Sequence, residues 1–383
     1  DIFDKAIYYY ERSLEIRPGE NYIFGDILHA KMQICNWKDW SNSIKKLTED
    51  ISKEKKIIGP FALTALIDNP SLIRKATEIF INDKFPKNGS LPEIYKIPKH
   101  SKIRIGYFSA DFREHPVSAL TIELYENHCR DKFEVYAFSY GPDTNDPMNL
   151  RIKSAVDYFY DIRSMSNTDS AILVRSLELD IAVDLGGFTQ DARTEIFSIS
   201  IAPIQLSYIG YLGTMGASYY DYLIADIVII PEKDQKSYTE KIVYLPTFQV
   251  NDSNQTETVT SLSRKDVGLP EKGFVFCCFN KSYKYNPRCF DIWARILNKV
   301  QNSVLLIYAE NNLAQSNLKK EITQRGIDSG RLIFGERLSR PEYLGRYKLA
   351  DLFLDTNPYN AGATSSDALR MGLPMLTLKG KSY

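Results

Sequence analysis

Hydrophobic residues recur at helical spacing over roughly the first 85 residues, after which the pattern changes. The apolar positions of this first part predict helices over residues 1–17, Tyr22–Ile34, Trp40–Lys53, Phe61–Leu66 and Ser71–Phe80. Asn69-Pro70 separates the last two helices, and Ser71 is the predicted N-cap of the last. Residues 86–99 are polar and interrupted by prolines, so we predict a linker there.

Short β-rich runs alternate with helical runs from Ile103 onward, which is typical of a parallel sheet with helices on both faces. The first series predicts strands over Ile103–Ser109, Phe133–Phe138, Ile181–Leu185, Ile204–Tyr208 and Tyr222–Ile224, and helices over Ser118–His128 and Asp169–Leu177. The polar segment Thr247–Arg264 interrupts the alternation and predicts a second linker. The second series predicts strands over Phe274–Phe279, Val304–Tyr308, Leu332–Phe334, Leu352–Leu354 and Met375–Leu378, and helices over Pro287–Val300, Ala314–Arg325, Arg340–Leu349 and Ser365–Met371. We therefore predict an α/β chain with two Rossmann-like lobes at residues 100–250 and 251–383, an arrangement that suits nucleotide-sugar transferases and other nucleotide enzymes.

The first helix carries the spacing of a known helical repeat. Ala6, Tyr10, Ser13 and Pro18 have the offsets of the second helix of a tetratricopeptide repeat, in which the proline ends the helix. An ordinary amphipathic helix is the alternative. Because a single repeat helix cannot bury its own apolar face, we predict a repeat remnant at residues 1–20, with further repeats upstream. Residues 21–99 are then a helical connector and linker.

The amino-acid composition argues against several classes of protein. Lys and Arg together number 48 and so do Asp and Glu, which argues against a protein that binds nucleic acid by neutralising phosphates. We expect no membrane span, because no apolar run reaches the roughly 20 residues that one needs. The five cysteines are scattered, which fits a reducing compartment and a cytoplasmic location. The four histidines lack zinc spacing, so no metal site is predicted.

Two candidate sites follow strands of the first lobe. His115 lies in the loop after the first strand, where a histidine can move a proton or donate a hydrogen bond near neutral pH; its alternative role is to cap the next helix. Gly210–Gly216 has the spacing GxxGxxG, which is not the dinucleotide fingerprint GxGxxG. These glycines permit either close approach to a ligand or an ordinary tight turn.

Two more candidates follow strands of the second lobe. Lys284, in the loop that begins at Asn280, can meet a phosphate as a compact charge, although lysines are also common surface residues. Gly362–Asp367 opens a helix whose free N–H groups can bind phosphate. Thr364 and Asp367 also have the spacing of a capping box, so capping alone is an alternative. All four sites directly follow predicted strands, which favours a shared function.

Several of these segments together resemble the protein O-GlcNAc transferase family, and its bacterial, SPINDLY-like members in particular. The segments are Ile103–Pro116 (IRIGYFSADFREHP), Ala202–Gln205 (APIQ), Ile209–Gly216 (IGYLGTMG), Cys278–Asn280 (CFN) with Tyr283-Lys284, and Leu349–Thr356 (LADLFLDT). The resemblance implies tetratricopeptide repeats followed by a GT-B catalytic region of two Rossmann-like lobes, which inverts the sugar's anomeric centre and uses no metal or other cofactor. It also implies a fragment truncated at both ends, with an incomplete second lobe.

The resemblance assigns roles to particular residues. His115 matches a histidine beside the sugar, and Lys284 matches the lysine that stabilises the departing diphosphate. The other nucleotide-sugar positions of the family fall on Gly210, Asn280, Lys281, Arg340, Arg346, Thr364 and Asp367. Among these, Gly210 corresponds to the acceptor side of the site, Thr364 to phosphate binding and Asp367 to ribose binding.

The implied function is transfer of N-acetylglucosamine from UDP-GlcNAc to Ser or Thr hydroxyls of proteins, with the acceptor held by the repeats and the cleft. One alternative is a protein O-fucosyltransferase that uses GDP-fucose. Another is an inactive repeat-based interaction protein, because Tyr343 and Gly362-Ala363 depart from the family pattern. A NAD-dependent oxidoreductase is disfavoured by the missing GxGxxG motif.

Overall fold

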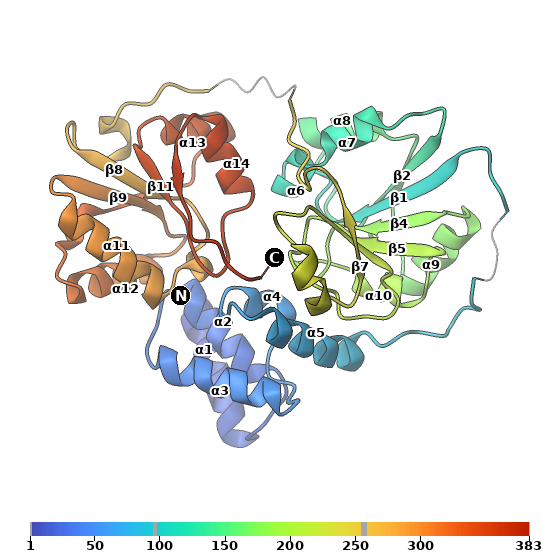
Figure 1. Ribbon diagram of the computed structural model, residues 1–383, viewed down its shortest axis with the longest axis horizontal. Coiled ribbons are helices and arrows are strands. Elements are labelled where there is room, and N and C mark those ends of the chain that lie inside the picture. The colour runs from blue at the N-terminus through green and yellow to red at the C-terminus, as the bar shows by residue number, and fades with distance from the viewer. Residues whose placement is uncertain (1, 95–97, 254–258, 383) are drawn as a thin grey trace. The chain divides into compact units, whose positions relative to one another are not determined.

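The computed structural model describes residues 2–94, 98–253 and 259–382. The chain divides into two compact units, one formed by the segments 1–69 and 256–382 and the other by residues 70–255. Figure 1 shows a sheet with flanking helices in each unit. Among the described residues, no helix combines the length and hydrophobicity that crossing a membrane would require.

The unit of residues 70–255 is built on a parallel seven-stranded sheet with the order β3-β2-β1-β4-β5-β6-β7. Its strands are β1 (Ile103–Ser109), β2 (Phe133–Ser139), β3 (Tyr158–Asp161), β4 (Ile181–Asp184), β5 (Ile204–Ser207), β6 (Tyr222–Ala225) and β7 (Lys241–Tyr244). Its helices are α5 (Pro70–Lys84), α6 (Pro116–Ala119), α7 (Ile122–Asn127), α8 (Pro147–Ala155), α9 (Asn167–Ser176) and α10 (Thr194–Ser198). Helices α7 and α8 lie on one side of the sheet, and α9 and α10 on the other (Figure 1). The central strand β1 is buried from Ile105 onward, as expected for a strand covered on both faces.

The second unit is built on a parallel five-stranded sheet with the order β10-β9-β8-β11-β12. Its strands are β8 (Phe274–Cys278), β9 (Ser303–Tyr308), β10 (Leu332–Gly335), β11 (Leu352–Leu354) and β12 (Met375–Leu376). The helices α11 (Pro287–Lys299), α12 (Asn312–Gln324), α13 (Arg340–Tyr347) and α14 (Ala363–Arg370) connect them. The apolar face of α11, with Phe290, Trp293 and Leu297, is buried.

The N-terminal helices α1 (Ile2–Ile16), α2 (Ile23–Gln33), α3 (Trp40–Ser52) and α4 (Pro60–Thr64) belong to this second unit. Ile7 of α1 packs with Ala30 and Ile34, and Leu313 of α12 packs against this cluster. The Asn317 side chain donates a hydrogen bond to the carbonyl of Ile34 at 2.8 Å. The assignment of residues 1–20 to a tetratricopeptide repeat stays a prediction.

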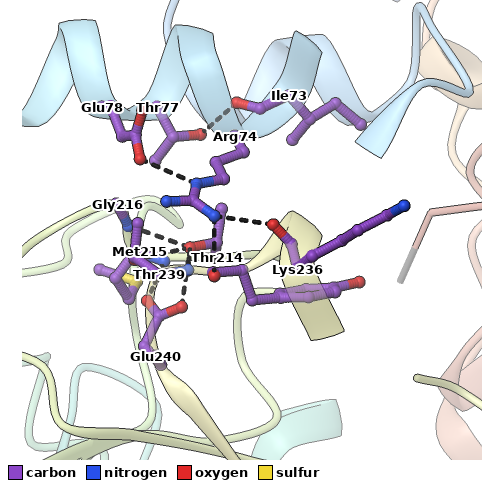
Figure 2. A network of polar contacts seen from close by, with 11 residues as sticks. Ile73, Arg74, Thr77, Glu78, Thr214, Met215, Gly216, Lys236, Thr239 and Glu240 are labelled. Carbon is purple, nitrogen blue, oxygen red and sulfur yellow. Dashed lines mark hydrogen bonds and ion pairs between the residues drawn. The ribbon is translucent and has the colours of Figure 1, made fainter. Parts of the chain in front are cut away.

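Helix α5 belongs instead to the unit of residues 70–255. Figure 2 shows Arg74 of α5 donating to the Glu78 carboxylate at 2.8 Å and to the carbonyl of Lys236 at 2.7 Å. Gly216 lies so close to α5 that a Cβ on it would be 2.9 Å from the Thr77 methyl group. The predicted connector at residues 21–99 is therefore divided between the two units.

The predicted elements are confirmed with a few corrections. Helix α5 begins at Pro70, so Ser71 lies inside the helix and is not its N-cap. The helix predicted over Ser118–His128 is two helices, α6 and α7, with Leu120 and Thr121 between them. Strands β3 and β7 were not predicted; both are short and at most half-buried, so neither shows a continuous apolar run. Helices α8 and α10 were also missed.

Candidate functional site

Three of the four predicted site loops lie where the strand order of a sheet reverses, and the fourth, at residues 210–216, follows β5. In the five-stranded sheet, the order runs outward in opposite directions from the pair β8 and β11. Residues 280–284 follow β8 and residues 355–367 follow β11, so these loops leave neighbouring strands at the same sheet edge. Ligands of open α/β sheets bind at this topological switch point. The seven-stranded sheet reverses between β1 and β4, and His115 lies in the loop after β1.

Asn280 joins the two loops of the second unit. Its side chain is buried, its Nδ2 donates to the Thr356 hydroxyl at 2.8 Å, and its Oδ1 accepts from the Thr364 hydroxyl at 2.6 Å. The alternative of a capping box formed by Thr364 and Asp367 is wrong, because Thr364 is the second residue of α14 and no described side chain caps this helix. The N-cap of α14 is Gly362, which has no side chain to cap the helix.

Lys284 is a buried cation beside this junction. It is 9% exposed, and its Nζ donates to the carbonyl of Asn360 at 3.0 Å and lies 3.7 Å from the centre of the Tyr359 ring. Burial lowers the pKa of Lys284 to about 8, against the opposing effect of the Asp355 carboxylate. An ammonium group that has lost much of its water is well prepared to receive an anion.

Arg340 and Asp367 form a bidentate ion pair across α13 and α14. Both guanidinium N–H···O distances to the carboxylate are 2.7 Å, and Asp367 is buried. This geometry fixes the carboxylate at the first turns of α14. The structure thus brings together two residues that the resemblance assigned to the nucleotide-sugar site.

Arg346 is another almost fully buried cation of this unit. It is 2% exposed, its Nη1 donates to the carbonyl of Glu336 at 2.9 Å, and its guanidinium lies 3.9 Å from the centre of the Phe279 ring. Burial lowers its pKa. Gly335 makes room for it, because a Cβ on that residue would lie 2.6 Å from Nη1. Its Nε has no hydrogen-bond partner within the described part of the chain.

Lys281 is turned toward a different neighbour. Its side chain is half-exposed and pairs with Glu310, which follows β9. Burial and the nearby Arg337 lower the pKa of Lys281. Its contact with a nucleotide sugar stays a prediction.

His115 caps α6 and so fulfils the alternative role that the sequence left open. Its Nδ1 accepts from the backbone N–H of Val117 at 3.3 Å and lies 3.4 Å from a carboxylate oxygen of Asp111. Burial lowers the pKa of His115, with Asp111 opposing the shift. Because both neighbours face Nδ1, Nε2 is the ring nitrogen left for a ligand. Capping and chemistry are therefore compatible at this residue.

Gly210 lies where the loops after β4 and β5 touch. A Cβ at this position would come within 1.7 Å of the carbonyl oxygen of Leu185, a contact that no side chain can make. Glu240 holds the loop that follows Gly210, as Figure 2 shows. The Glu240 carboxyl group accepts from the Thr214 hydroxyl at 2.7 Å and from the backbone N–H of Met215, and burial raises its pKa.

We expect Gly210→Ala to destabilise the unit of residues 70–255 by at least about 2 kcal/mol, because the backbone of one loop must move to admit the methyl group. Urea denaturation followed by circular dichroism measures this. Gly89→Ala is the matched control, since a Cβ there meets nothing within 4 Å, and its unfolding midpoint should hardly change. Equal stability of the two variants would contradict the close approach of the loops.

Several residues that build the site were not among the predicted site residues. Asp355 accepts from the backbone N–H groups of Thr356 and Ala361, both at 2.8 Å, and so shapes the turn before α14. Tyr359 and Asn360 provide the surroundings of Lys284. The one sequence signal for these residues was that Asp355-Thr356 directly follows a predicted strand.

A family model described as glycosyl transferase family 41 matches residues 90–260 and 250–383, which together contain both sheets. The chain belongs to glycosyl transferase family 41. This confirms the predicted family.

Relatives of this family 41 chain include two proteins of Arabidopsis thaliana. The chain is 31% identical over 374 residues to the probable UDP-N-acetylglucosamine–peptide N-acetylglucosaminyltransferase SEC, covering 92% of this chain and 38% of that protein. It is 30% identical over 290 residues to the correspondingly named SPINDLY, covering 73% and 31%. The chain thus spans well under half the length of these relatives.

A solved structure supports the fold of this family 41 chain. The O-GlcNAc transferase mutant of Thermobaculum terrenum matches with a TM-score of 0.81 and 25% identity, over 99% of this chain and 73% of that one. The predicted GT-B type of fold, with two Rossmann-like lobes after a helical N-terminal part, is confirmed.

Proposed function

We propose that the protein is an inverting glycosyltransferase that moves N-acetylglucosamine from UDP-GlcNAc to Ser or Thr hydroxyls of protein acceptors. The observation that carries this proposal is the buried Lys284 ammonium beside the junction of Asn280 and Thr364 at a topological switch point. The names of the SEC and SPINDLY relatives support the donor and the peptide acceptor.

In the proposed reaction, an acceptor hydroxyl oxygen attacks the anomeric carbon, and the bond from that carbon to the β-phosphate oxygen breaks. The bonding electrons leave with UDP, and the hydroxyl proton is released. Lys284 offsets the negative charge that develops on the diphosphate, as preorganised cations do at departing phosphates. The backbone N–H groups at the start of α14 add further donors. The Thr364 hydroxyl joins them when its hydrogen turns from the Asn280 side chain, to which it donates, toward the phosphate.

The remaining residues have binding and orienting roles in this proposal. Asp367, fixed by Arg340, accepts hydrogen bonds from the ribose hydroxyls. Arg346 lies near the base and His115 near the sugar. The helical repeats hold the peptide acceptor. That the reaction needs no metal ion stays a prediction.

A thermal-shift experiment tests the nucleotide. We expect UDP at a hundredfold excess over its Kd to stabilise the unit that carries Lys284 by about 2.7 kcal/mol, because it binds the native state alone. GDP at the same concentration should shift its melting temperature far less. A larger shift with GDP would instead favour the O-fucosyltransferase alternative. Binding of UDP with no transfer from UDP-GlcNAc to any protein acceptor would favour the inactive interaction protein.

A further inference from the structure

Four aromatic rings link the N-terminal helices to the loop that carries Lys284. We call the set of His29, Phe61, Tyr283 and Tyr359 the aromatic bridge. Phe61 of α4 lies 5.8 Å from Tyr283 and 6.4 Å from Tyr359, and His29 of α2 lies 5.8 Å from Tyr283, all measured between ring centres. Tyr283 and Tyr359 are themselves 6.1 Å apart. These are the separations at which aromatic pairs attract each other.

Lys284 contacts Tyr359, one of the four rings of the aromatic bridge. Its Nζ lies 3.7 Å from the centre of the Tyr359 ring, well within the range of a cation–π interaction. Tyr283 is the residue that directly precedes Lys284 in the short 3₁₀ helix Ser282–Lys284. The lysine is therefore held by one ring through space and by a second ring through the backbone.

The two helices that carry His29 and Phe61 are firmly attached to each other and to this loop. Gly25 of α2 approaches residues 57 and 58 so closely that a Cβ on it would lie 2.6 Å from the side chain of Ile58. The Cys35 thiol, just after α2, donates to the carbonyl of Ser282 at 3.7 Å. A shift of these helices would therefore reach the lysine loop through packed contacts.

We propose that Phe61 and His29 are positioning residues that hold Lys284 in place through Tyr283 and Tyr359, so that the N-terminal helices set the affinity of the site for a diphosphate. This inference rests on the proposed function, because it takes Lys284 as the diphosphate contact. It gives the N-terminal helices a role in binding the donor.

The physical basis is the shape and dryness of the lysine's surroundings. Without the Phe61 ring, Tyr359 loses its contact on the side facing α4 and can rotate away from the ammonium. Water then enters, and the Lys284 ammonium becomes solvated and mobile. It therefore binds an anion less strongly. The loss should fall on the diphosphate and not on the nucleoside.

The test compares the Kd of UDP with the Kd of uridine by isothermal titration calorimetry. We expect the preference for UDP over uridine to fall at least fivefold in Phe61→Leu, while the Kd of uridine changes less than twofold. Phe61→Tyr keeps the ring and should retain the preference of the wild type. If Phe61→Leu does not fold, His29→Leu is measured against the same criterion.

Trp37→Leu is the matched control. Trp37 also lies in the N-terminal helical segment, and its ring lies 5.0 Å from Phe290 of α11 and is not part of the aromatic bridge. Its loss should lower the melting temperature and leave the preference for UDP unchanged. An unchanged preference in Phe61→Leu, or an equal fall in both variants, would overturn the positioning role. A wild-type protein with no preference for UDP over uridine would overturn both this inference and the proposed function.

Discussion

Lys284→Met is expected to lower kcat for sugar transfer by on the order of 10²–10³, the usual loss when one preorganised charge at a departing group is removed. The ammonium is buried and donates to the carbonyl of Asn360. Lys281 of the same loop is paired with Glu310, so it is not placed to replace Lys284. Methionine fills a similar volume without the charge. Transfer of radiolabelled sugar to an acceptor protein measures the rate.

The same variant should be more stable than the wild type at neutral pH. A pKa lowered from 10.5 to about 8 means that holding this charge in the folded protein costs on the order of 3 kcal/mol. Below pH 8 the folded and unfolded forms both carry the proton, so the cost is fully present. Between pH 8 and 10.5 the folded form releases its proton first, so the stability of the wild type rises relative to the variant.

Lys320→Met is the control, because Lys320 is an exposed lysine of α12. It should change neither the rate nor the pH dependence of stability. Transfer by Lys284→Met at the wild-type rate would contradict the central assignment, whatever the stability shows.

His115→Asn is expected to lower the transfer rate by about 10²-fold or more, within the range that positioned acid–base groups contribute. Asparagine is one of the best N-cap residues, so it preserves the capping of α6 that His115 now provides through Nδ1. It cannot supply the imidazole. The variant therefore separates the two roles of this residue, and steady-state kinetics with UDP-GlcNAc gives the answer.

His115→Ala completes the comparison, since it removes the cap and the ring together and should cost about 1 kcal/mol of stability in addition. If the asparagine variant transfers sugar like the wild type and the alanine variant does not, His115 is a helix cap alone.

The residues that sequence reasoning located well are those whose signal is local. Strands β1 and β11 have the predicted bounds, Ile103–Ser109 and Leu352–Leu354, because both are short segments rich in aliphatic and aromatic residues and buried over most of their length. The four candidate loops were found because each directly follows such a strand.

The predictions that failed or were missed depend on residues far apart in the sequence. Thr364 has the spacing of a helix cap, but it lies inside α14, and its hydroxyl donates to Asn280, 84 residues earlier in the sequence. The ring that supports Lys284 belongs to Tyr359, which follows another strand. Nothing in a local window indicates either contact, and the same holds for the division of the helical connector between two units.

The division of the chain into one continuous and one discontinuous unit also determines the order in which its parts can fold during synthesis. Residues 70–255 are one continuous stretch, so they can fold as soon as they leave the ribosome. The other unit needs residues from both ends of the chain, so helices α1–α4 must wait for the second sheet to be synthesised. During that interval Trp37 and Phe61 have no Phe290 or Tyr359 to pack against. Until the second sheet is synthesised, these aromatic side chains are therefore open to aggregation.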